Sequence, residues 1–350
     1  MAVSIQTLAA VAQLRRDLEA MTDAQTLALT RAWVEAWDVL LPEFEAAAAD
    51  LMEQQIRGRV SRTAAARNVR LRGALEAAQA YLQELAATTA DVVTRDIPEA
   101  LRTAVDAHRQ IVTTQLPPGS VGSTINFARV ADEALAAMVA RTTQQIHSDT
   151  KPLAADVVRM MKKHLVRGIA VGDNPRETAR RLVKEAEGRF NGGLTRALVI
   201  SRTETLDAHR EATKASEKAN SDLLTEWEWH ANLSSRTCPS CLSKHGQRFP
   251  LEQGGPYDHQ QGRCSRVSVT KSWKDLGFDI PEPKSVTPDA EEWFNNLTEA
   301  TQRDIMGPER LRLLQDGSIS WKDLSSKQEN PGWRDSFIPT SVKDLRSLSV

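Results

Sequence analysis

The stretch "RTCPSCLSKHGQRFPLEQGGPYDHQQGRCSR", residues 236–266, holds all three cysteines of a 350-residue chain. Within it the spacing is Cys238-x2-Cys241-x17-His259-x4-Cys264. Two thiolates two residues apart on a tight turn can face one metal ion, and a second pair from the far side of the loop can complete a tetrahedron. The pattern therefore predicts a structural Zn²⁺ site with three cysteine ligands and one histidine ligand.

Two further residues suit this interpretation. Pro239 stiffens the turn between the first two cysteines, and Gly262 lets the chain fold back between His259 and Cys264. Four protein ligands leave no open coordination position, so the metal would hold the loop together rather than catalyse a reaction. We expect no catalytic residue and no enzymatic activity. His230 and His245 are expected to be surface or strand histidines rather than ligands.

Three alternatives remain open at this point. The cysteines could be small buried side chains without a metal. "CPSC" could be a redox motif, although such a motif should open a helix after a strand, and "LSKHGQRFP" is a poor helix former. The Asp258-His259 pair could belong to an HNH-type nuclease, but that site needs a further histidine downstream and none follows His259.

The elements around the cysteines read as strands. In "EWEWHA", Trp227 and Trp229 alternate with polar residues, the period of a half-buried strand, and "RVSVTKSW" from residue 266 alternates likewise. The cysteine-rich stretch is thus predicted to lie between two strands.

The first half of the chain is predicted to be mostly helix. Residues 1–170 contain five of the 17 glycines and five of the 15 prolines. Apolar residues recur there at steps of three and four, as in Trp33, Trp37, Leu40, Phe44, Ala48 and Leu51. Asn174 and Pro175 are predicted to start another helix, Gly188 to end it, and the glycines at 192–193 to precede the next.

These patterns predict a mainly α chain with a smaller α+β module. Long N-terminal helices would be followed by a zinc-stapled helix–strand domain and an extended C-terminal tail. Four segments are expected along the chain. Long helices would occupy residues 1–116 and a helical connector residues 117–190. The core with the zinc loop would occupy residues 191–285, and C-terminal helices with the tail residues 286–350.

Composition limits the function classes. The 45 Lys and Arg residues nearly cancel the 46 Asp and Glu residues, so no bulk charge points to nucleic acid or to an anionic membrane. No apolar run approaches the ~18 residues that span a bilayer, and "MAVSIQTLAAVAQLRR" lacks the features of a secretion signal. We expect a chain made and kept in a cytosol, without a membrane partner.

One local patch departs from this balance. Residues 57–72 contain six arginines and no acidic residue: Arg57, Arg59, Arg62, Arg67, Arg70 and Arg72. Such a stripe is a candidate contact for DNA phosphates or for acidic residues of a neighbouring protein. A solvated helix face is the alternative, because the stretch lacks aromatic stacking partners.

The second half of the chain resembles the phage Mu F-like, SPP1-type minor head protein family, also called phage head morphogenesis proteins. The resemblance covers residues 170–325 approximately. It begins with "GDNPRETARRL", continues with "RTET", "AHREA", Trp229, "RTCPSC" and "HGQRF", and extends to "WFNNLTEATQRDIMGPERLRLLQDGSISWKDL". Two departures are Ser234 and Ser235, where members often carry an aspartate, and Gly262, where members often carry a further cysteine.

The resemblance implies a structural protein of a tailed-phage head. It would be made in the bacterial host cytoplasm and act at the portal vertex, inside the head, in assembly and in DNA packaging or ejection. The implied partners are the portal protein, the major capsid or scaffolding protein and packaged DNA, with several copies per virion. A phage-encoded zinc-dependent nucleic-acid-binding, nuclease or redox module is the alternative function.

The resemblance also assigns a structural role to Arg202 and Glu204, beside Trp229. This charged pair would tie its helix to the zinc loop. Residues two apart lie on different sides of a helix, so the two side chains should not pair with each other. Two charges on a solvated helix face are the alternative.

Overall fold

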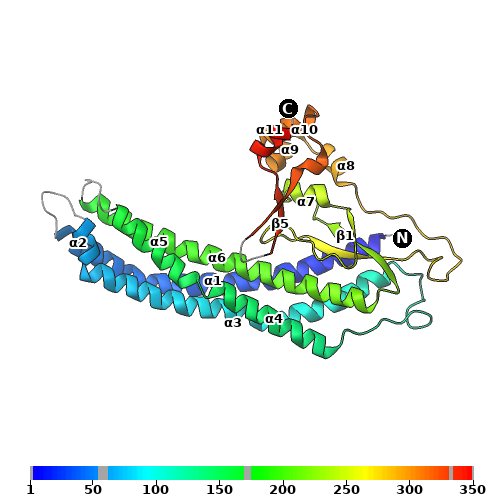
Figure 1. Cartoon of the computed structure of the whole chain (residues 1–350), viewed down its shortest axis with the longest axis horizontal. Helices are drawn as coiled ribbons and strands as arrows, with labels where there is room; N and C mark the ends of the chain where they lie inside the picture. The colour runs from blue at the N-terminus through cyan, green and yellow to red at the C-terminus, as the bar shows by residue number, and fades with distance from the viewer. Residues whose placement is uncertain (1–2, 54–61, 169–174, 331–333, 349–350) are drawn as a thin grey trace. The chain divides into compact units, whose positions relative to one another are not determined.

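The computed structural model describes residues 3–53, 62–168, 175–330 and 334–348 (Figure 1). The chain is mainly helical with two small antiparallel sheets, which confirms the predicted class. The helices are α1 (Ile5–Glu53), α2 (Arg62–Arg67), α3 (Val69–Thr113), α4 (Asp132–Thr150), α5 (Leu153–Gly168), α6 (Pro175–Ala219), α7 (Pro239–Lys244), α8 (Ala290–Asn295), α9 (Glu299–Met306), α10 (Pro308–Gln315), the 3-10 helix η1 (Trp321–Leu324) and α11 (Val342–Leu348).

The chain divides into two compact units whose segments alternate along the sequence. Unit 1 comprises Met1–Glu19, Pro98–Met138 and Leu206–Val350, whereas unit 2 comprises Ala20–Ile97 and Val139–Thr205. The helices α1, α3, α4 and α6 therefore contribute residues to both units. The four segments predicted from the sequence follow chain order, and their boundaries remain predictions.

Unit 2 is a helical bundle with an apolar core. The predicted stripe on α1 is buried in it, with Trp33, Leu40 and Phe44 at most 1% exposed. Phe190 of α6 lies against two α1 tryptophans, with ring centroids 6.3 Å from Trp33 and 5.3 Å from Trp37. The indole Nε1 of Trp33 donates to the carbonyl of Phe190 at 3.3 Å. Apolar periodicity thus located this core correctly.

The helix break predicted at Gly188 and Gly192–193 is wrong. Helix α6 begins at Pro175, as predicted, but continues without interruption to Ala219. Its predicted N-cap, Asn174, lies outside the described residues. Gly193 serves close packing instead: an added Cβ would lie 3.1 Å from Val157 Cγ2 and 3.6 Å from both Leu82 Cδ2 and Trp33 Cζ2. A glycine can therefore sit inside a helix because a neighbouring helix leaves no room for a side chain.

Unit 1 contains a three-stranded antiparallel sheet of β1 (Leu224–His230), β2 (Arg248–Pro250) and β3 (Ser265–Thr270), in the order β2-β1-β3. Strands β1 and β3 lie before and after the cysteines in the sequence, which confirms the two predicted strands, whereas β2 lies between the cysteines and was not predicted. Trp227 pairs with Phe249 on one side and with Ser268 on the other. Trp227 and Trp229 are buried, as the alternation predicts, but Glu228 and His230 are buried as well, so this end of β1 is covered on both faces.

The C-terminal residues fold onto the same unit, in contrast to the extended tail that the sequence suggested. Strands β4 (Ser325–Gln328) and β5 (Ser336–Pro339) form a second antiparallel sheet. Leu345 of α11 is fully buried in a cluster that includes Leu242 of α7 and Phe294 of α8. Phe337 N donates to Tyr257 O at 2.7 Å, which joins β5 to the loop before His259.

Two histidines of unit 1 are buried as neutral rings. His108 contacts Ser216 Oγ through Nδ1 at 2.8 Å. The Nε2 atoms of His108 and His209 have no hydrogen-bond partner among the described residues. Burial first, and then a nearby arginine, lower the pKa of His108 to about 4 and that of His209 to about 3. Protonation of either ring therefore opposes folding of unit 1.

Matched substitutions test the packing role of Gly193. Gly193→Leu should destabilise the protein by ~1–3 kcal/mol, because the new side chain overpacks the contact with Val157 and Trp33. Gly192→Leu is the control, since Gly192 is exposed and its Cβ would meet nothing within 4 Å. The control should gain up to ~1 kcal/mol of helix stability. Urea unfolding of both variants measures the difference, and equal stabilities would refute the packing argument.

The buried histidines predict acid sensitivity. As the pH falls from about 6.5, the ordinary histidine value, to about 4, His108 takes up a proton in the unfolded chain but not in the folded one. The free energy of unfolding should therefore fall by ~1.4 kcal/mol per pH unit from this group. His108→Gln should make the decline between pH 6.5 and 4 shallower in urea titrations, whereas the exposed control His147→Gln should not. Identical slopes for all three proteins would contradict the prediction.

Candidate metal centre

Helix α7 places the first two predicted ligands at one end of a short element. Cys238 is its N-cap residue, with an extended backbone, and Pro239 occupies the first turn. The Sγ of Cys238 accepts a hydrogen bond from Cys241 N at 3.4 Å. Both thiols therefore lie at the helix start, where unpaired backbone N–H groups favour negatively charged sulfur. The "CPSC" motif does open a helix after a strand, contrary to the sequence-based expectation.

The other two predicted ligands come from the loop between β2 and β3. The ligand atoms of Cys238, Cys241 and His259 lie within 4.8 Å of one another, and those of Cys241, Asp258 and Cys264 do likewise. Cys241 belongs to both groups, so it joins all four predicted ligands into one cluster. The four are not all within that distance of one another. Ligand atoms around tetrahedral zinc are separated by roughly 3.5–4 Å, so the four side chains would have to move closer together to bind one ion.

Hydrogen bonds between the cluster residues perturb their acidities. The hydrogen bond with Cys241, assisted by His259, lowers the pKa of Cys238 to about 5. The bond with Cys238 raises the pKa of His259 to about 9. Hydrogen bonds with Cys238 and Cys264 raise the pKa of Cys241. Zn²⁺ binding would displace the protons of these side chains, because a metal binds thiolates and unprotonated imidazole.

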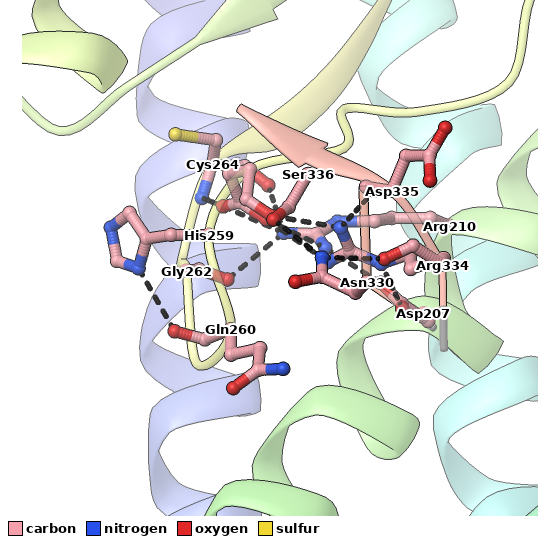
Figure 2. A network of polar contacts seen from close by, with 11 residues as sticks. Asp207, Arg210, His259, Gln260, Gly262, Cys264, Asn330, Arg334, Asp335 and Ser336 are labelled. Atoms are coloured by element: carbon pink, nitrogen blue, oxygen red, sulfur yellow. Dashed lines mark hydrogen bonds and ion pairs between the residues drawn. The ribbon is translucent and has the colours of Figure 1, made fainter. Parts of the chain in front are cut away.

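The orientation of His259 also fits a metal ligand. Its Nδ1 lies 2.9 Å from the backbone carbonyl of Gln260 (Figure 2). A ring that donates one N–H to a carbonyl can bind a metal through its other nitrogen once that nitrogen has lost its proton. His259 Nε2 is therefore the nitrogen that could coordinate an ion together with the three thiolates.

Asp258 supports this loop rather than serving as a ligand. Its side chain has no solvent exposure. Its oxygens lie 3.0 Å from Arg210 Nη1, 3.0 Å from Arg210 Nη2, 3.5 Å from Arg334 Nη2 and 3.0 Å from Cys264 N. A carboxylate bound to two guanidinium groups and a backbone N–H has little capacity left for a metal ion.

Gly262 lies in the turn back from His259, where its N–H donates to His259 O at 2.8 Å, and it is also constrained by Asp258. A Cβ at this position would lie 2.2 Å from Asp258 Cγ, so only glycine allows the carboxylate to lie against the backbone. The residue with a left-handed backbone in this turn is Gln261, with φ of 62°. The glycine thus provides space, and its neighbour makes the turn.

Arg210 of α6 connects the helix to the cysteine loop. Its Nη2 donates to Gly262 O at 2.9 Å and to Cys264 O at 3.0 Å, in addition to Asp258 (Figure 2). Arg334, just before β5, donates to Asp258 O at 2.8 Å and contacts the carboxylate of Asp207. Neither Arg210 nor Arg334 was predicted from the sequence to contact the cysteine loop. The signal that could have found Arg210 is its position within "AHREA", on the helix that precedes the strand.

The residues predicted to have a structural role lie in different places. Trp229 packs in one cluster with the three cysteines, and its ring lies edge-on to Phe337 at 6.0 Å. Arg202 Nη2 pairs with Asp23 Oδ1 at 2.8 Å, and both residues belong to unit 2. Glu204 is buried in unit 2 as well. Within unit 1, the α6 arginine that bonds to the cysteine loop is Arg210, so the role of Arg202 and Glu204 remains a prediction.

The arginine-rich stretch is described only in part. Arg57 and Arg59 lie outside the described residues, and Arg62 begins α2 but its side chain is not among them. Arg67, Arg70 and Arg72 are exposed. Their contact with DNA or with a partner protein remains a prediction.

Comparison with known proteins supports the sequence resemblance. Residues 159–265 match the family described as "Phage Mu protein F like protein". The match includes all of α6, strands β1 and β2, helix α7 and all four predicted zinc ligands. No curated protein and no solved structure matches the chain significantly. Among the described residues, no helix is long and apolar enough to cross a membrane.

The buried charge of Asp258 predicts a large effect of its removal. Asp258→Asn keeps the shape of the side chain but leaves Arg210 without its main counter-charge, so the free energy of unfolding should fall by ~3–5 kcal/mol. The exposed control Asp222→Asn should change it by less than ~0.5 kcal/mol. Urea unfolding followed by tryptophan fluorescence measures both, and a small loss for Asp258→Asn would show that the network is not required for folding.

Proposed function

We propose that this chain, whose residues 159–265 match the phage Mu F-like family, is a structural head protein of a tailed phage that acts at the portal vertex. The match supports a role in head morphogenesis. The observation that carries the proposal is that the matched region contains the whole Cys/His cluster, supported by buried charges from α6 and the C-terminal segment. The cluster would stabilise a docking module, and we assign no catalytic residue.

Zn²⁺ is the metal that this ligand set favours. Cys238, Cys241, His259 and Cys264 would hold the ion, and when bound it would supply a tetrahedral cross-link between α7, the 259–264 loop and the start of β3. Three thiolates and one imidazole suit Zn²⁺ better than the hard cations Ca²⁺ or Mg²⁺. The carbonyl bond of His259 and the bonds from Asp258 and Arg210 to the loop are the supporting shell that such a site requires.

The partners that we propose are the portal protein and the major capsid or scaffolding protein, with several copies of the chain in each virion. Exposed apolar side chains on α1 support a role in protein–protein contact, because Leu27, Val34 and Val39 are 52%, 52% and 55% exposed. Packaged DNA is the further partner proposed for the arginine-rich stretch. Location inside the head and a role in packaging or ejection follow from the same proposal.

A thiol–disulfide module is the second candidate. Two observations favour it. Cys238 is the N-cap of α7, the helix that follows β1 and its loop. Hydrogen bonding also lowers the pKa of the Cys238 thiol to about 5. In such a module two of the three thiols would form a reversible disulfide. Zinc and disulfide exclude each other at the same sulfurs, so one measurement distinguishes the two candidates.

Native mass spectrometry before and after a strong chelator tests the zinc site. We expect one Zn²⁺ per chain, released together with loss of folded structure in unit 1, because the four ligands come from separate elements. His259→Gln should lower zinc affinity strongly, whereas His147→Gln, at an exposed site in α4, should not. A folded protein without metal and with one disulfide would instead support the thiol module.

The head function is tested in virions of the phage that encodes the chain. Quantitative mass spectrometry of purified particles should find the chain in several copies, and particles made without it should assemble or infect poorly. Absence of the chain from purified virions would refute the structural role, whatever the metal content of the isolated protein.

A further inference from the structure

A pocket of about 290 Å³ opens beside the Cys/His cluster, within unit 1. The four predicted zinc ligands form part of its wall, and residues of α1 and of the loops around 234 and 262 form the rest. Four arginines line it, Arg15, Arg16, Arg236 and Arg263, whereas Glu19 is the acidic residue among the lining residues that the structure describes. The pocket therefore has an excess of positive charge in a nearly neutral chain.

Two of the four arginines are already engaged. Arg15 donates through Nη2 to His230 O at 2.9 Å and through Nε to Ser265 Oγ at 3.3 Å, so it is fixed on the sheet. Arg263 Nη1 lies 2.7 Å from Glu19 Oε1, and both side chains are 41% exposed. In this ion pair the carboxylate of the pocket wall neutralises one of the four arginines.

The other two arginines lack an acidic partner in the described part of the chain. Arg16 contacts the neutral amide of Gln13, with Nε 3.2 Å from Oε1. Arg236 is exposed and has no polar side-chain contact among the described residues. Guanidinium groups bind carboxylates through paired N–H donors, so two of them beside one pocket suit an acidic ligand.

The pocket wall also contains a strained residue. Gln261 lines the pocket and has a left-handed backbone, with φ of 62°. Non-glycine residues in this region cost free energy and occur preferentially at ligand sites and turns. Gln261 therefore fixes the turn that forms this part of the pocket wall.

We propose that this pocket binds acidic side chains of a partner protein, with Arg16 and Arg236 as the anchoring residues. The volume suits one or two side chains entering from a protein surface. A DNA duplex is a poorer fit, because it presents its phosphates along a convex surface rather than as a group that enters a small pocket. That the partner is another head protein rests on the proposed function, whereas the binding of acidic side chains does not.

The test measures binding of a fluorescent peptide of about ten residues in which Glu and Gly alternate. Fluorescence anisotropy at low and at physiological salt should detect binding of this peptide to the full chain but not of the same peptide with Gln in place of Glu. Arg16→Gln/Arg236→Gln should weaken binding by ~10-fold, because both guanidinium groups that would hold the carboxylates are lost. A labelled single-stranded DNA of similar charge is measured in parallel.

A charge-matched double variant provides the control. Arg129→Gln/Lys284→Gln removes two exposed positive charges elsewhere in unit 1 and should change the peptide affinity less than ~2-fold. Equal weakening by both double variants, or no binding of the peptide, would overturn the proposal. Tighter binding of the DNA, lost on Arg16→Gln/Arg236→Gln, would assign the pocket to nucleic acid and would also overturn it.

Two further readouts separate this proposal from the proposed function. Circular dichroism and zinc content should be unchanged in Arg16→Gln/Arg236→Gln, because neither residue belongs to the ligand set or to the buried charge network. If that variant enters virions normally but no longer binds the peptide, the pocket is not used in assembly and the structural role stands. If the chain is absent from virions but binds the peptide, the head function fails and the pocket stands.

Discussion

Asp258 carries a carboxylate with no solvent exposure, and the cysteine loop depends on how that charge is compensated. Burial alone would lower the pKa of Arg210, but the carboxylates of Asp258 and Asp207 outweigh that effect and raise it. The Arg210 guanidinium also donates to the carbonyls of Gly262 and Cys264. The ion pair with Asp258 and the conformation of the loop therefore stabilise each other. A buried ion pair contributes little net stability, but it strongly disfavours any conformation that leaves one charge unpaired.

A second buried pair fixes the sheet on the same helix. Glu217 Oε2 lies 2.7 Å from Arg266 Nη2, and both side chains are at most 1% exposed. Arg266 also donates to the carbonyls of Leu251 and Gln253 and lies over the ring of Trp227, with its Cζ 4.3 Å from the centroid. Helix α6 therefore carries two charged residues, Arg210 and Glu217, that bind the cysteine-rich segment. Arg210 contacts the loop before β3, and Glu217 contacts Arg266 in β3 itself.

This arrangement gives a physical meaning to the match with phage Mu F-like proteins. The matched residues are not an independent domain, because the segment before β5 supplies Arg334 and the N-terminal part of α1 supplies Arg15. These contacts would make the surface beside the Cys/His cluster rigid, as the proposed docking role requires. The metal, where bound, would add a cross-link to a loop that buried charges already orient.

The amino-acid sequence alone determined the helical character, the flanking strands, the grouping of the cysteines with His259 and the family resemblance, because each depends on local periodicity, spacing or motif order. The sequence did not reveal why glycine is required at two positions. An added Cβ would meet Val157 of another helix at Gly193 and the buried Asp258 carboxylate at Gly262. The sequence also did not identify Arg210 and Arg334, since charged residues on a helix or in a loop look solvated until their partners are known. Only the tertiary structure decided which charges are buried together, because desolvation and ion pairing depend on contacts between segments that the order of residues does not reveal.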